Sequence, residues 1–490
     1  PDIITGYNIF GFDFEFMYKR ASGLNILPDF LKLGRNGRHS SFVHKNLTTN
    51  AYGHNEMNYI EMHGRVLIDL FKFVRINYKF PNYKLDTVCA NFLFKEKAGI
   101  APYQIFNYQR YAEQRGKDCR KQVAMYCVID CILCNRLMNS MQVLDRNCVL
   151  ATVSKVPLSY LFLRGQSIKL LSLLFYYCDH CKDTKYLIED KAIQPGYTQP
   201  ESESYEGATV LDPVIKLHNI PVAVGDFNSL YPNSMIARNI SHDTLVCPGS
   251  EYWNSETNQP DFERLKTDGF ELVHSFNYYE QPGVVDPVPG ILYNTGDEST
   301  RTYYVLYQGN EYRGILDLML MELIQLRKDT RAKQKLTKDK FHWNILESQQ
   351  LAAKVLCNSA YGILGATSSK IYNKNIAACV TAVGRSMINA AKGYVEKTFV
   401  DKCTEIEYLG EKHTVYTKET HCVYGDTDSI FIQFHNYYDK DYTKQILGLE
   451  SVYTAHALCE YACDQISNVV INTKPERIEF EKVIWPFILF

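Results

Sequence analysis

The sequence lacks the features that would place a protein in a membrane or outside the cell. No run of eighteen apolar residues occurs among its 490 residues, and its first residues do not resemble a secretory signal. Internal repeats and low-complexity segments are also missing, which excludes a repeat architecture. We therefore expect no membrane partner. What remains, with 46% hydrophobic and 22% charged residues, is typical of an ordinary soluble globular protein.

A charge excess of either sign is missing as well. The formal net charge is −2, so any basic surface that binds nucleic acid must be local. The 15 cysteines do not follow the pattern of a secreted disulfide scaffold, which predicts a reducing, intracellular compartment.

Two CxxC pairs are candidates for metal binding, but neither has a partner pair at the spacing of a zinc finger. Cys131 and Cys134 follow Cys127 at helical spacing, so we interpret all three as small core residues of a helix. Cys178 and Cys181 could form half of a zinc site, which is the weaker hypothesis for that pair.

The length predicts two to four domains, because a single hydrophobic core rarely extends over 490 residues. The chain begins with Pro1 rather than Met, which predicts that it is a fragment of a longer protein.

The stretch 421–434 has the pattern of a β-hairpin. A short apolar run ends at Gly425, and a β-rich run restarts at Ile430. Asp426 and Asp428 fall at the tip between them. An acidic hairpin tip is usually a solvated turn, and that interpretation holds unless another segment supplies a partner.

A predicted strand nearly two hundred residues upstream supplies such a partner. The apolar run 220–224 predicts a strand buried on both faces, which ends at Gly225 and delivers Asp226 just past its end. Carboxylates from these two places could hold two hard divalent cations, since Mg²⁺ prefers oxygen ligands and commonly binds through carboxylates and substrate phosphates. The simpler alternative for Asp226 is a strand-end cap.

Between these two places, residues 310–362 change to a helical pattern. Two long helices are predicted on either side of a charged turn centred at 339–340. In an antiparallel pair of helices, Arg327 and Lys354 would lie at one level and could bind the same anion, and Arg331 shares the face of Arg327. A basic, solvated helix face is the alternative.

Three stretches resemble the motifs of family B DNA polymerases. Residues 226–232 (DFNSLYP) are similar to the first motif, residues 354–362 (KVLCNSAYG) to the second, and residues 424–429 (YGDTDS) to the third. Three motifs in this order, each several residues long, form a specific signal.

The resemblance implies a catalytic site with two metal ions. Asp226, Asp428 and the backbone carbonyl of Phe227 would hold two Mg²⁺ ions, for which Mn²⁺ could substitute. Asp426 would lie close by in a secondary catalytic role.

The resemblance also implies a nucleotide site. Arg327 and Lys354 would hold the triphosphate, with Arg331 as a helper. Tyr361 would pack at the minor-groove side of the new base pair, and Tyr231 beneath the sugar would leave no room for the 2′-hydroxyl that distinguishes RNA from DNA. The full set of implied nucleotide-binding residues is Ser229, Leu230, Tyr231, Arg327, Arg331, Lys354, Asn358 and Tyr361.

Two shorter elements extend the resemblance. Residues 205–208 (YEGA) are similar to a YxGG element, which implies that Tyr205 and Gly207 touch the template, although Ala208 stands where glycine is usual. Residues 477–482 (RIEFEK), which we expect to end a strand, resemble an LExEK element near the active site.

The N-terminal part resembles the 3′–5′ proofreading exonuclease joined to these polymerases. Asp13 matches its second motif, and Tyr126 and Asp130, at i and i+4 of a predicted helix, match the third. The first motif, Asp-x-Glu, is missing and would precede Pro1, so the nuclease site would lack part of its metal ligands. We interpret Asp69, at the end of a predicted strand, as structural.

The implied fold class is α/β (α+β), with a truncated RNase H-like exonuclease domain, a polymerase palm built on an antiparallel sheet, and a two-helix fingers insertion. The expected parts are the exonuclease domain 1–150, a helical linker region 151–204, the first part of the palm 205–309, the fingers hairpin 310–370 and the second part of the palm 371–490. A thumb domain with a KKRY element is expected to follow Phe490.

The implied function is template-directed DNA synthesis from dNTPs on primer–template DNA. Residues 226–241 are most similar to polymerases of large double-stranded DNA viruses, which implies viral DNA replication in the host cytoplasm or nucleus. A sliding clamp or another processivity factor is the expected partner.

Two alternatives belong to other classes. A catalytically inactive, polymerase-shaped DNA-binding scaffold is disfavoured because Asp226, Asp426 and Asp428 are all present. A protein whose main activity is the nuclease is disfavoured because the first exonuclease motif is missing.

Overall fold

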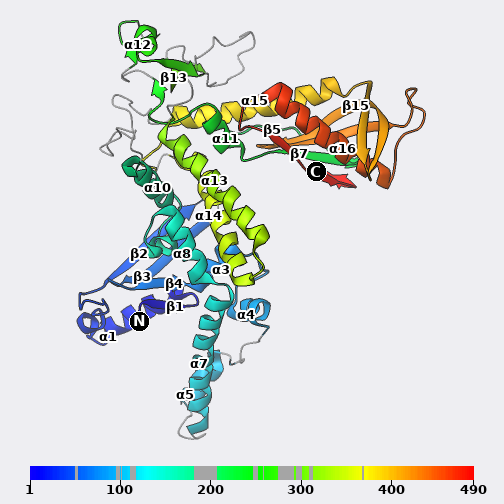
Figure 1. The fold of residues 1–490 in the computed structure, drawn as a ribbon. Helices are drawn as coiled ribbons and strands as arrows, with labels where there is room; N and C mark the ends of the chain where they lie inside the picture. The colour runs from blue at the N-terminus through cyan, green and yellow to red at the C-terminus, as the bar shows by residue number, and fades with distance from the viewer. Residues whose placement is uncertain are drawn as a thin grey trace. The chain divides into compact units, whose positions relative to one another are not determined.

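The computed structural model divides the chain into two compact units. It describes residues 1–49, 53–94, 100, 102–110, 117–180, 207–246, 252–257, 259–273, 292–293, 301–307, 313–366 and 369–489. The first unit comprises residues 1–168 and 333–352, and the second comprises residues 169–332 and 353–490. Figure 1 shows the elements of each. Within the described ranges, no helix combines the length and the hydropathy needed to cross a membrane.

The first unit contains two pairs of strands. β1 (Ile3–Gly6) pairs in parallel with β4 (Val66–Asp69), and β2 (Ser41–Thr49) forms an antiparallel pair with β3 (Gly53–Glu61). The strand predicted within residues 64–70 is therefore confirmed.

Helices pack around these strands. Among them, α4 begins directly after Lys84, its N-cap. The helices of this part of the chain are η1 (Ile9–Asp13), α1 (Phe14–Gly23), α2 (Leu27–Phe30), α3 (Leu70–Asn77), α4 (Leu85–Leu93), α5 (Pro102–Arg110), α7 (Lys117–Ser140), α8 (Val143–Ser154), α9 (Leu158–Leu163) and α10 (Ser167–His180), the last of which continues into the second unit.

One core of the first unit forms where α7 packs against β4 and α3. Leu133, Cys134 and Leu137 are buried there. Cys127 and Cys131 are exposed, so their interpretation as core residues is wrong. Helical spacing places the three cysteines on one stripe, but the neighbouring elements cover that stripe only near Cys134. The second CxxC pair includes Cys181, which lies outside the described residues.

The second unit is organised around an antiparallel sheet. Its strands follow the order β14–β15–β16–β7–β17, and β5 pairs with the end of β15. Their bounds are β5 (Val210–Leu211), β7 (Val222–Phe227), β14 (Lys402–Tyr408), β15 (Glu411–Asp426), β16 (Ser429–Tyr437) and β17 (Ile478–Ile484). The predicted hairpin is confirmed as β15 and β16.

Strand β7 differs from its prediction at one end. Residues 222–224 are fully buried, as predicted, but the strand continues through Asp226 to Phe227. The prediction that Asp226 lies past the strand is wrong, because β16 and β17 both pair with β7 at this position. Gly225 does not break the strand: a Cβ there would lie 3.1 Å from Cys463 Sγ, so glycine permits close packing.

Two helices pack on one face of this sheet. Figure 1 shows α15 (Lys374–Thr398) and α16 (Leu449–Gln465) lying along it. Phe399, Phe434 and Leu458 are buried in the core that these helices share with the sheet. Residues 477–482 begin β17, whereas we expected them to end a strand.

Shorter elements complete the described part of the second unit. A small sheet has the order β11–β13–β12, with β8 paired to β13, and two further strand pairs are β9–β10 and β6–β18. These elements are β6 (Leu217–His218), β8 (Leu245–Val246), β9 (Trp253–Asn254), β10 (Gln259–Pro260), α12 (Phe262–Thr267), β11 (Phe270–Val273), β12 (Leu292–Tyr293), β13 (Arg301–Tyr307), η3 (Ile466–Ile471) and β18 (Phe487–Ile488).

The two predicted long helices are α13 (Ile315–Leu336) and α14 (Lys340–Leu364), with a turn at 337–339. Both helices belong partly to each unit, because residues 333–352 group with the first. The division into units thus follows other boundaries than the expected domains, which remain predictions.

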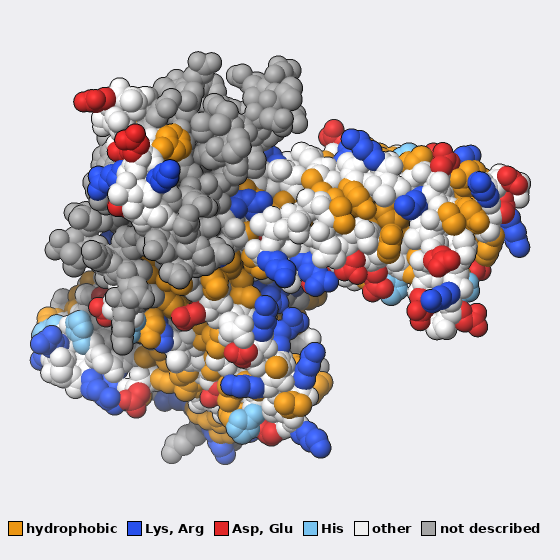
Figure 2. Space-filling view, turned by 45° about the horizontal axis from the view of Figure 1, so that its top comes forward, with side chains coloured by type: hydrophobic (Ala, Val, Ile, Leu, Met, Phe, Trp, Pro, Cys, Tyr) orange, Lys and Arg blue, Asp and Glu red, His pale blue; other side chains and the backbone are white. Residues whose placement is uncertain are grey.

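The described surface mixes charges of both signs. On the face seen in Figure 2, acidic and basic side chains are interspersed, in keeping with the net charge of −2. Binding of an anionic partner therefore depends on local groups rather than on the net charge.

Candidate functional site

A pocket of about 440 Å³ opens in the second unit, where segments far apart in the sequence meet. Its lining comes from β7, the start of α11 (Leu230–Ala237), α13, α14, the turn between β15 and β16, and β17. The lining residues are Asp226, Phe227, Asn228, Ser229, Leu230, Tyr231, Pro232, Arg327, Lys354, Asn358, Thr427, Asp428, Glu479, Phe480 and Glu481. All three stretches that carry the polymerase-like motifs contribute to this one cavity.

Sheet hydrogen bonds bring Asp226 and Asp428 to the same place. Asp226 lies opposite Ser429 of β16 on one side and opposite Glu479 of β17 on the other. The backbone N–H of Phe227 donates to the carbonyl oxygen of Asp428 at 2.7 Å. The turn that carries Asp428 is therefore tied directly to the strand that carries Asp226.

The turn itself is tight. Thr427 has a φ of 55°, in the left-handed region, and its N–H donates to Thr209 at 3.1 Å. Asp426 ends β15, and its carboxylate accepts a hydrogen bond from the Thr427 hydroxyl at 2.9 Å. Asp426 is not among the described residues that line the pocket, and Asp428 is.

The carboxylates of this site repel one another. Burial and the charges of Asp428 and Glu481 together raise the pKa of Asp226 to about 6, against the opposing charges of Lys482 and Lys354. Burial also raises the pKa of Asp428, and Asp426 and Glu481 add to that increase. Within the described part of the chain, neither Asp226 nor Asp428 receives an ion pair from a cationic side chain. Clustered carboxylates without such compensation are the donor set that a hard divalent cation fits.

Two acidic residues of the pocket were missing from the sequence-based site. Glu479 and Glu481 lie on β17, and both line the cavity. The resemblance of residues 477–482 to an element near the active site was the available signal, but the sequence did not indicate which side chains face the pocket.

Cationic side chains from the two long helices line the same pocket. Arg327 comes from α13, and Lys354 and Asn358 come from α14. Burial lowers the pKa of Arg327, and the nearby charge of Arg331 lowers it further. Arg331 itself is exposed and is not among the described lining residues.

Two tyrosines meet beside the pocket. The rings of Tyr231 and Tyr361 have centroids 4.4 Å apart and an interplanar angle of 39°. Gly384 of α15 allows α11 to approach closely, because a Cβ there would lie 3.2 Å from Leu230 and 3.3 Å from Tyr231. Close packing against α15 thus fixes the start of α11.

Comparison with known families shows to which family the sequence belongs. A sequence model described as "DNA polymerase family B" matches residues 156–490, which contain the whole pocket. The chain belongs to the family B DNA polymerases. A second model, described as "DNA polymerase family B, exonuclease domain", matches residues 1–88.

Several curated relatives of this family B chain match all of it. A DNA polymerase of Pyramimonas orientalis virus is 31% identical over 100% of this chain and 44% of the relative. DNA polymerase delta catalytic subunits of Candida albicans and Glycine max are 32% and 33% identical, again over 100% of this chain, and over 40% and 38% of the relatives. The chain thus spans about two fifths of the length of these relatives.

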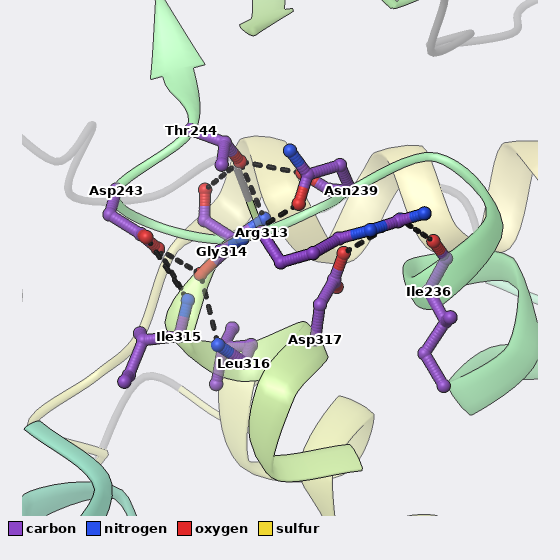
Figure 3. A network of polar contacts seen from close by, with 10 residues as sticks. Ile236, Asn239, Asp243, Thr244, Arg313, Gly314, Ile315, Leu316 and Asp317 are labelled. Atoms are coloured by element: carbon purple, nitrogen blue, oxygen red, sulfur yellow. Dashed lines mark hydrogen bonds and ion pairs between the residues drawn. The ribbon is translucent and has the colours of Figure 1, made fainter. Parts of the chain in front are cut away.

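In this family B chain, a polar clasp holds the N-terminus of α13 (Figure 3). Three consecutive backbone N–H groups, of residues 314–316, donate to side-chain oxygens of Asn239, Asp243 and Ser241, at 2.7, 3.0 and 3.2 Å respectively. These bonds satisfy N–H groups that a helix start leaves without intrahelical partners. Sequence reasoning missed the clasp, since nothing in the spacing of these polar residues indicates a helix about seventy positions later.

Arg313 links α11 to α13 beside this clasp. Its guanidinium donates to the carbonyl oxygen of Ile236 at 2.9 Å and lies 3.9 Å from the Asp317 carboxylate. Asp317 is 0% exposed, and burial raises its pKa well above the usual range, with Asp243 adding to the increase and Arg313 opposing it. The network thus joins the start of α13 to α11, the helix that carries Tyr231 at its other end.

The predicted exonuclease residues lie in the first unit. Asp13 is the last residue of η1, and burial raises its pKa. Tyr126 and Asp130 lie one turn apart on α7, so the predicted helix around them is confirmed. None of these three residues lines the pocket of the second unit.

Asp69 is buried, with 2% exposure, and its carboxylate is used within the fold. It caps α3 through the N–H of Phe71 at 3.0 Å, and it accepts the N–H groups of Asn8 at 2.8 Å and Phe10 at 3.0 Å. These three bonds confirm the structural interpretation of Asp69.

Of the two predicted template contacts, Tyr205 and Gly207, the structure describes the surroundings of Gly207. The carbonyl oxygen of Gly207 accepts a hydrogen bond from Arg385 of α15 at 2.8 Å. Tyr205 lies outside the described residues.

Proposed function

We propose that this chain carries the synthesis site of a DNA-directed DNA polymerase, which adds deoxynucleotides to a primer 3′-hydroxyl opposite a template. One observation supports this proposal above the others. A single pocket is lined by Asp226 and Asp428 and also by Arg327 and Lys354, so acidic and cationic groups from distant segments face one cavity. A metal-bound nucleoside triphosphate has the matching distribution of charge.

The acidic end of the pocket fits divalent metal ions. Asp226, Asp428 and the carbonyl oxygen of Phe227 would hold two Mg²⁺ ions, and Mn²⁺ could substitute for them. The raised pKa of Asp226 supports this fit, because it reflects burial and, after that, the negative charges of Asp428 and Glu481, which Lys482 and Lys354 compensate only partly. When bound, such ions make the attacking hydroxyl more acidic and neutralise charge that develops on the phosphate. Asp426 would act from a second position, by adding negative charge next to Asp428.

The cationic end of the pocket fits the triphosphate. Arg327 would supply a planar fork for two phosphate oxygens, and Lys354 would supply a point charge. Asn358 lines the pocket one turn beyond Lys354 and would support this contact. Arg331 would help from outside the lining, through its long-range charge.

The pocket residues where α11 begins fit the sugar and base of the nucleotide. Ser229 and Leu230 line the pocket at the start of α11, next to Tyr231. The Tyr231 ring, held against Tyr361, would leave no room for a 2′-hydroxyl and so favour deoxynucleotides. Tyr361 would pack beside the new base pair.

The first unit is proposed to edit the product. Asp13, Tyr126 and Asp130 would belong to a metal-dependent 3′–5′ exonuclease site, in which the tyrosine orients the attacking water. Tyr205 and Gly207 would contact the template strand between the two activities.

Primer–template DNA and dNTPs are the proposed substrates, and a sliding clamp or another processivity factor is the proposed partner. Similarity to a viral DNA polymerase supports a role in viral DNA replication, in the host cytoplasm or nucleus.

Primer extension tests the proposal. The full-length protein should extend a primer with dNTPs and Mg²⁺ and should extend it poorly with ribonucleotides, whereas Tyr231→Ala should accept ribonucleotides more readily. Asp428→Ala should bind primer–template with unchanged affinity and add no nucleotide. If the wild-type protein binds primer–template but extends it with neither substrate, the scaffold alternative replaces this proposal.

A further inference from the structure

We propose that Glu419, His421 and His435, on strands β15 and β16, form a binding site for one divalent transition-metal ion of the Zn²⁺ type. Among the described residues, their ligand atoms form a group of donors within 4.8 Å of one another. The inference does not depend on the proposed polymerase activity.

Strand geometry places the three donors on one face of the sheet. Glu419 and His421 are two residues apart on β15, so their side chains point to the same side. Thr420, which lies between them, is buried on the opposite side. In the register of the two strands, Glu419 lies directly opposite His435, and directly opposed side chains of an antiparallel pair lie close together.

The spacing of the donor atoms suits a metal with short bonds to nitrogen and oxygen. His421 Nε2 lies 3.6 Å from one carboxylate oxygen of Glu419, and His435 Nδ1 lies 3.7 Å from the other. Tetrahedral ligands about 2.1 Å from a zinc ion lie roughly 3.4 Å from one another. Small rotations of exposed side chains would therefore close the site around an ion, and a fourth position would remain for water.

The donor types select the class of metal. Two imidazoles with one carboxylate suit Zn²⁺, Ni²⁺ or Co²⁺ better than Mg²⁺ or Ca²⁺, which prefer oxygen ligands. The His421 and His435 rings are nearly perpendicular, with an interplanar angle of 85°, and their centroids are 5.7 Å apart.

Charges around His435 act in both directions. Burial lowers the pKa of His435, Glu419 raises it, and His421, Lys216 and Lys418 lower it. The two lysines also weaken cation binding. One of them, Lys418, makes a cation–π contact, with its ammonium 5.9 Å from the centre of the Tyr442 ring.

The site is separate from the polymerase pocket. His421 precedes Asp426 by five positions on β15, which corresponds to roughly 17 Å along a strand. A metal here would join the two strands of the hairpin whose turn carries Asp428. We therefore expect it to stabilise the hairpin without contacting a nucleotide.

Zinc binding by the purified chain tests this inference. Zn²⁺ is titrated against a chromophoric chelator in buffer with excess Mg²⁺, which occupies sites built from carboxylates. Glu419→Gln, His421→Ala and His435→Gln should each lose one equivalent of Zn²⁺ or weaken it at least tenfold. His342→Ala is the matched control, since His342 is an exposed imidazole that lies 2.6 Å from a carboxylate, that of Asp339, outside the three-donor group.

Two further readouts separate a metal site from a plain ion pair. Co²⁺ should give the visible absorption of a tetrahedral complex in the wild-type chain and lose it in His421→Ala. Saturating Zn²⁺ should raise the unfolding midpoint by about 2–4 °C in the wild type but not in folded His421→Ala. Equal Zn²⁺ binding in all folded variants, or no binding by the wild type, would overturn the proposal and leave Glu419 as an ion-pair partner of two histidines.

Discussion

The two units of the chain use carboxylates at or near strand ends in opposite ways. In the first unit, the Asp69 carboxylate accepts hydrogen bonds from three backbone N–H groups, so its oxygens are already bound within the fold. In the second unit, Asp226 and Asp428 line an open pocket, and their main interactions with neighbouring groups are repulsive. All of these acidic residues lie at or near strand ends, so position along the chain does not distinguish them.

The difference teaches that hydrogen-bond partners distinguish a structural carboxylate from a ligand better than the direction of its pKa shift does. Burial raises the pKa of Asp69 and of Asp226 alike. Only at Asp69 do backbone N–H groups oppose that increase, and only at Asp226 do neighbouring carboxylates add to it. The second pattern leaves negative charge available for a cation.

The largest expected effect is on synthesis. Asp226→Ala in the full-length protein should lower the rate of nucleotide addition by about a thousandfold or more, because it removes a ligand of the catalytic metals. Asp13→Ala should change that rate less than about twofold. Single-turnover primer extension measures the rate of nucleotide addition by both variants. Comparable losses of rate would show that Asp226 matters no more for synthesis than Asp13 does.

The second largest effect is on stability. Asp69→Ala should lower the free energy of unfolding by about 3 kcal/mol or more, since one buried and two partly buried backbone N–H groups lose their acceptor. Asp86→Ala, an exposed position in the first turn of α4, should change it by less than about 0.5 kcal/mol. Denaturant titration followed by circular dichroism measures the free energy of unfolding of each variant. Asp226→Asn should be no less stable than the wild type, and a large loss there would make Asp226 a structural residue like Asp69.

A smaller effect is expected at the cationic end of the pocket. Lys354→Ala should raise the KM for dNTPs by about 10–100-fold, because a charge-assisted contact to phosphate is lost. Arg331→Ala should raise it by less than about threefold, since Arg331 is not among the described residues that line the pocket. Steady-state kinetics measures the KM for dNTPs of both variants. Equal increases in KM would show that the pocket lining does not define the nucleotide site.

Much of this arrangement could be predicted from the sequence because its signals are local. The hairpin of β15 and β16, the buried start of β7 and the two long helices all follow from apolar periodicity and turn residues. The predicted turn centred at 339–340 put Arg327 and Lys354 at one level of the helix pair, and both line the same pocket.

The parts that sequence reasoning missed depend on contacts between distant segments. Asp226 lies within β7 rather than past it, because two neighbouring strands extend the pairing. The clasp by Asn239, Ser241 and Asp243 joins a loop to a helix start far along the chain. The exposure of Cys127 shows the same limit, since helical spacing defines a stripe but not what covers it.

The smallest expected effect concerns pH. Metal binding requires the ionised form of Asp226, whose pKa is raised to about 6, so affinity for Mn²⁺ should fall as the pH drops from 7 to 5. An ordinary aspartate would lose its charge only near pH 4. Mn²⁺ titrations between pH 5 and 8 should show this decrease, up to about tenfold per pH unit below 6, and Asp226→Asn should remove it. Constant affinity down to pH 5 would contradict the electrostatic environment described for this carboxylate.

The most direct measurement of the central claim is metal-dependent nucleotide binding by this chain. Electron paramagnetic resonance counts Mn²⁺ ions bound in the presence and absence of a dNTP, for the wild type, Asp226→Asn, Lys354→Ala and Asp13→Asn. We expect the wild type and Asp13→Asn to gain two bound Mn²⁺ ions with the nucleotide, and both pocket variants to lose this gain. Full retention of nucleotide-dependent Mn²⁺ binding in Asp226→Asn would contradict the claim that the pocket of the second unit is the nucleotidyl-transfer site.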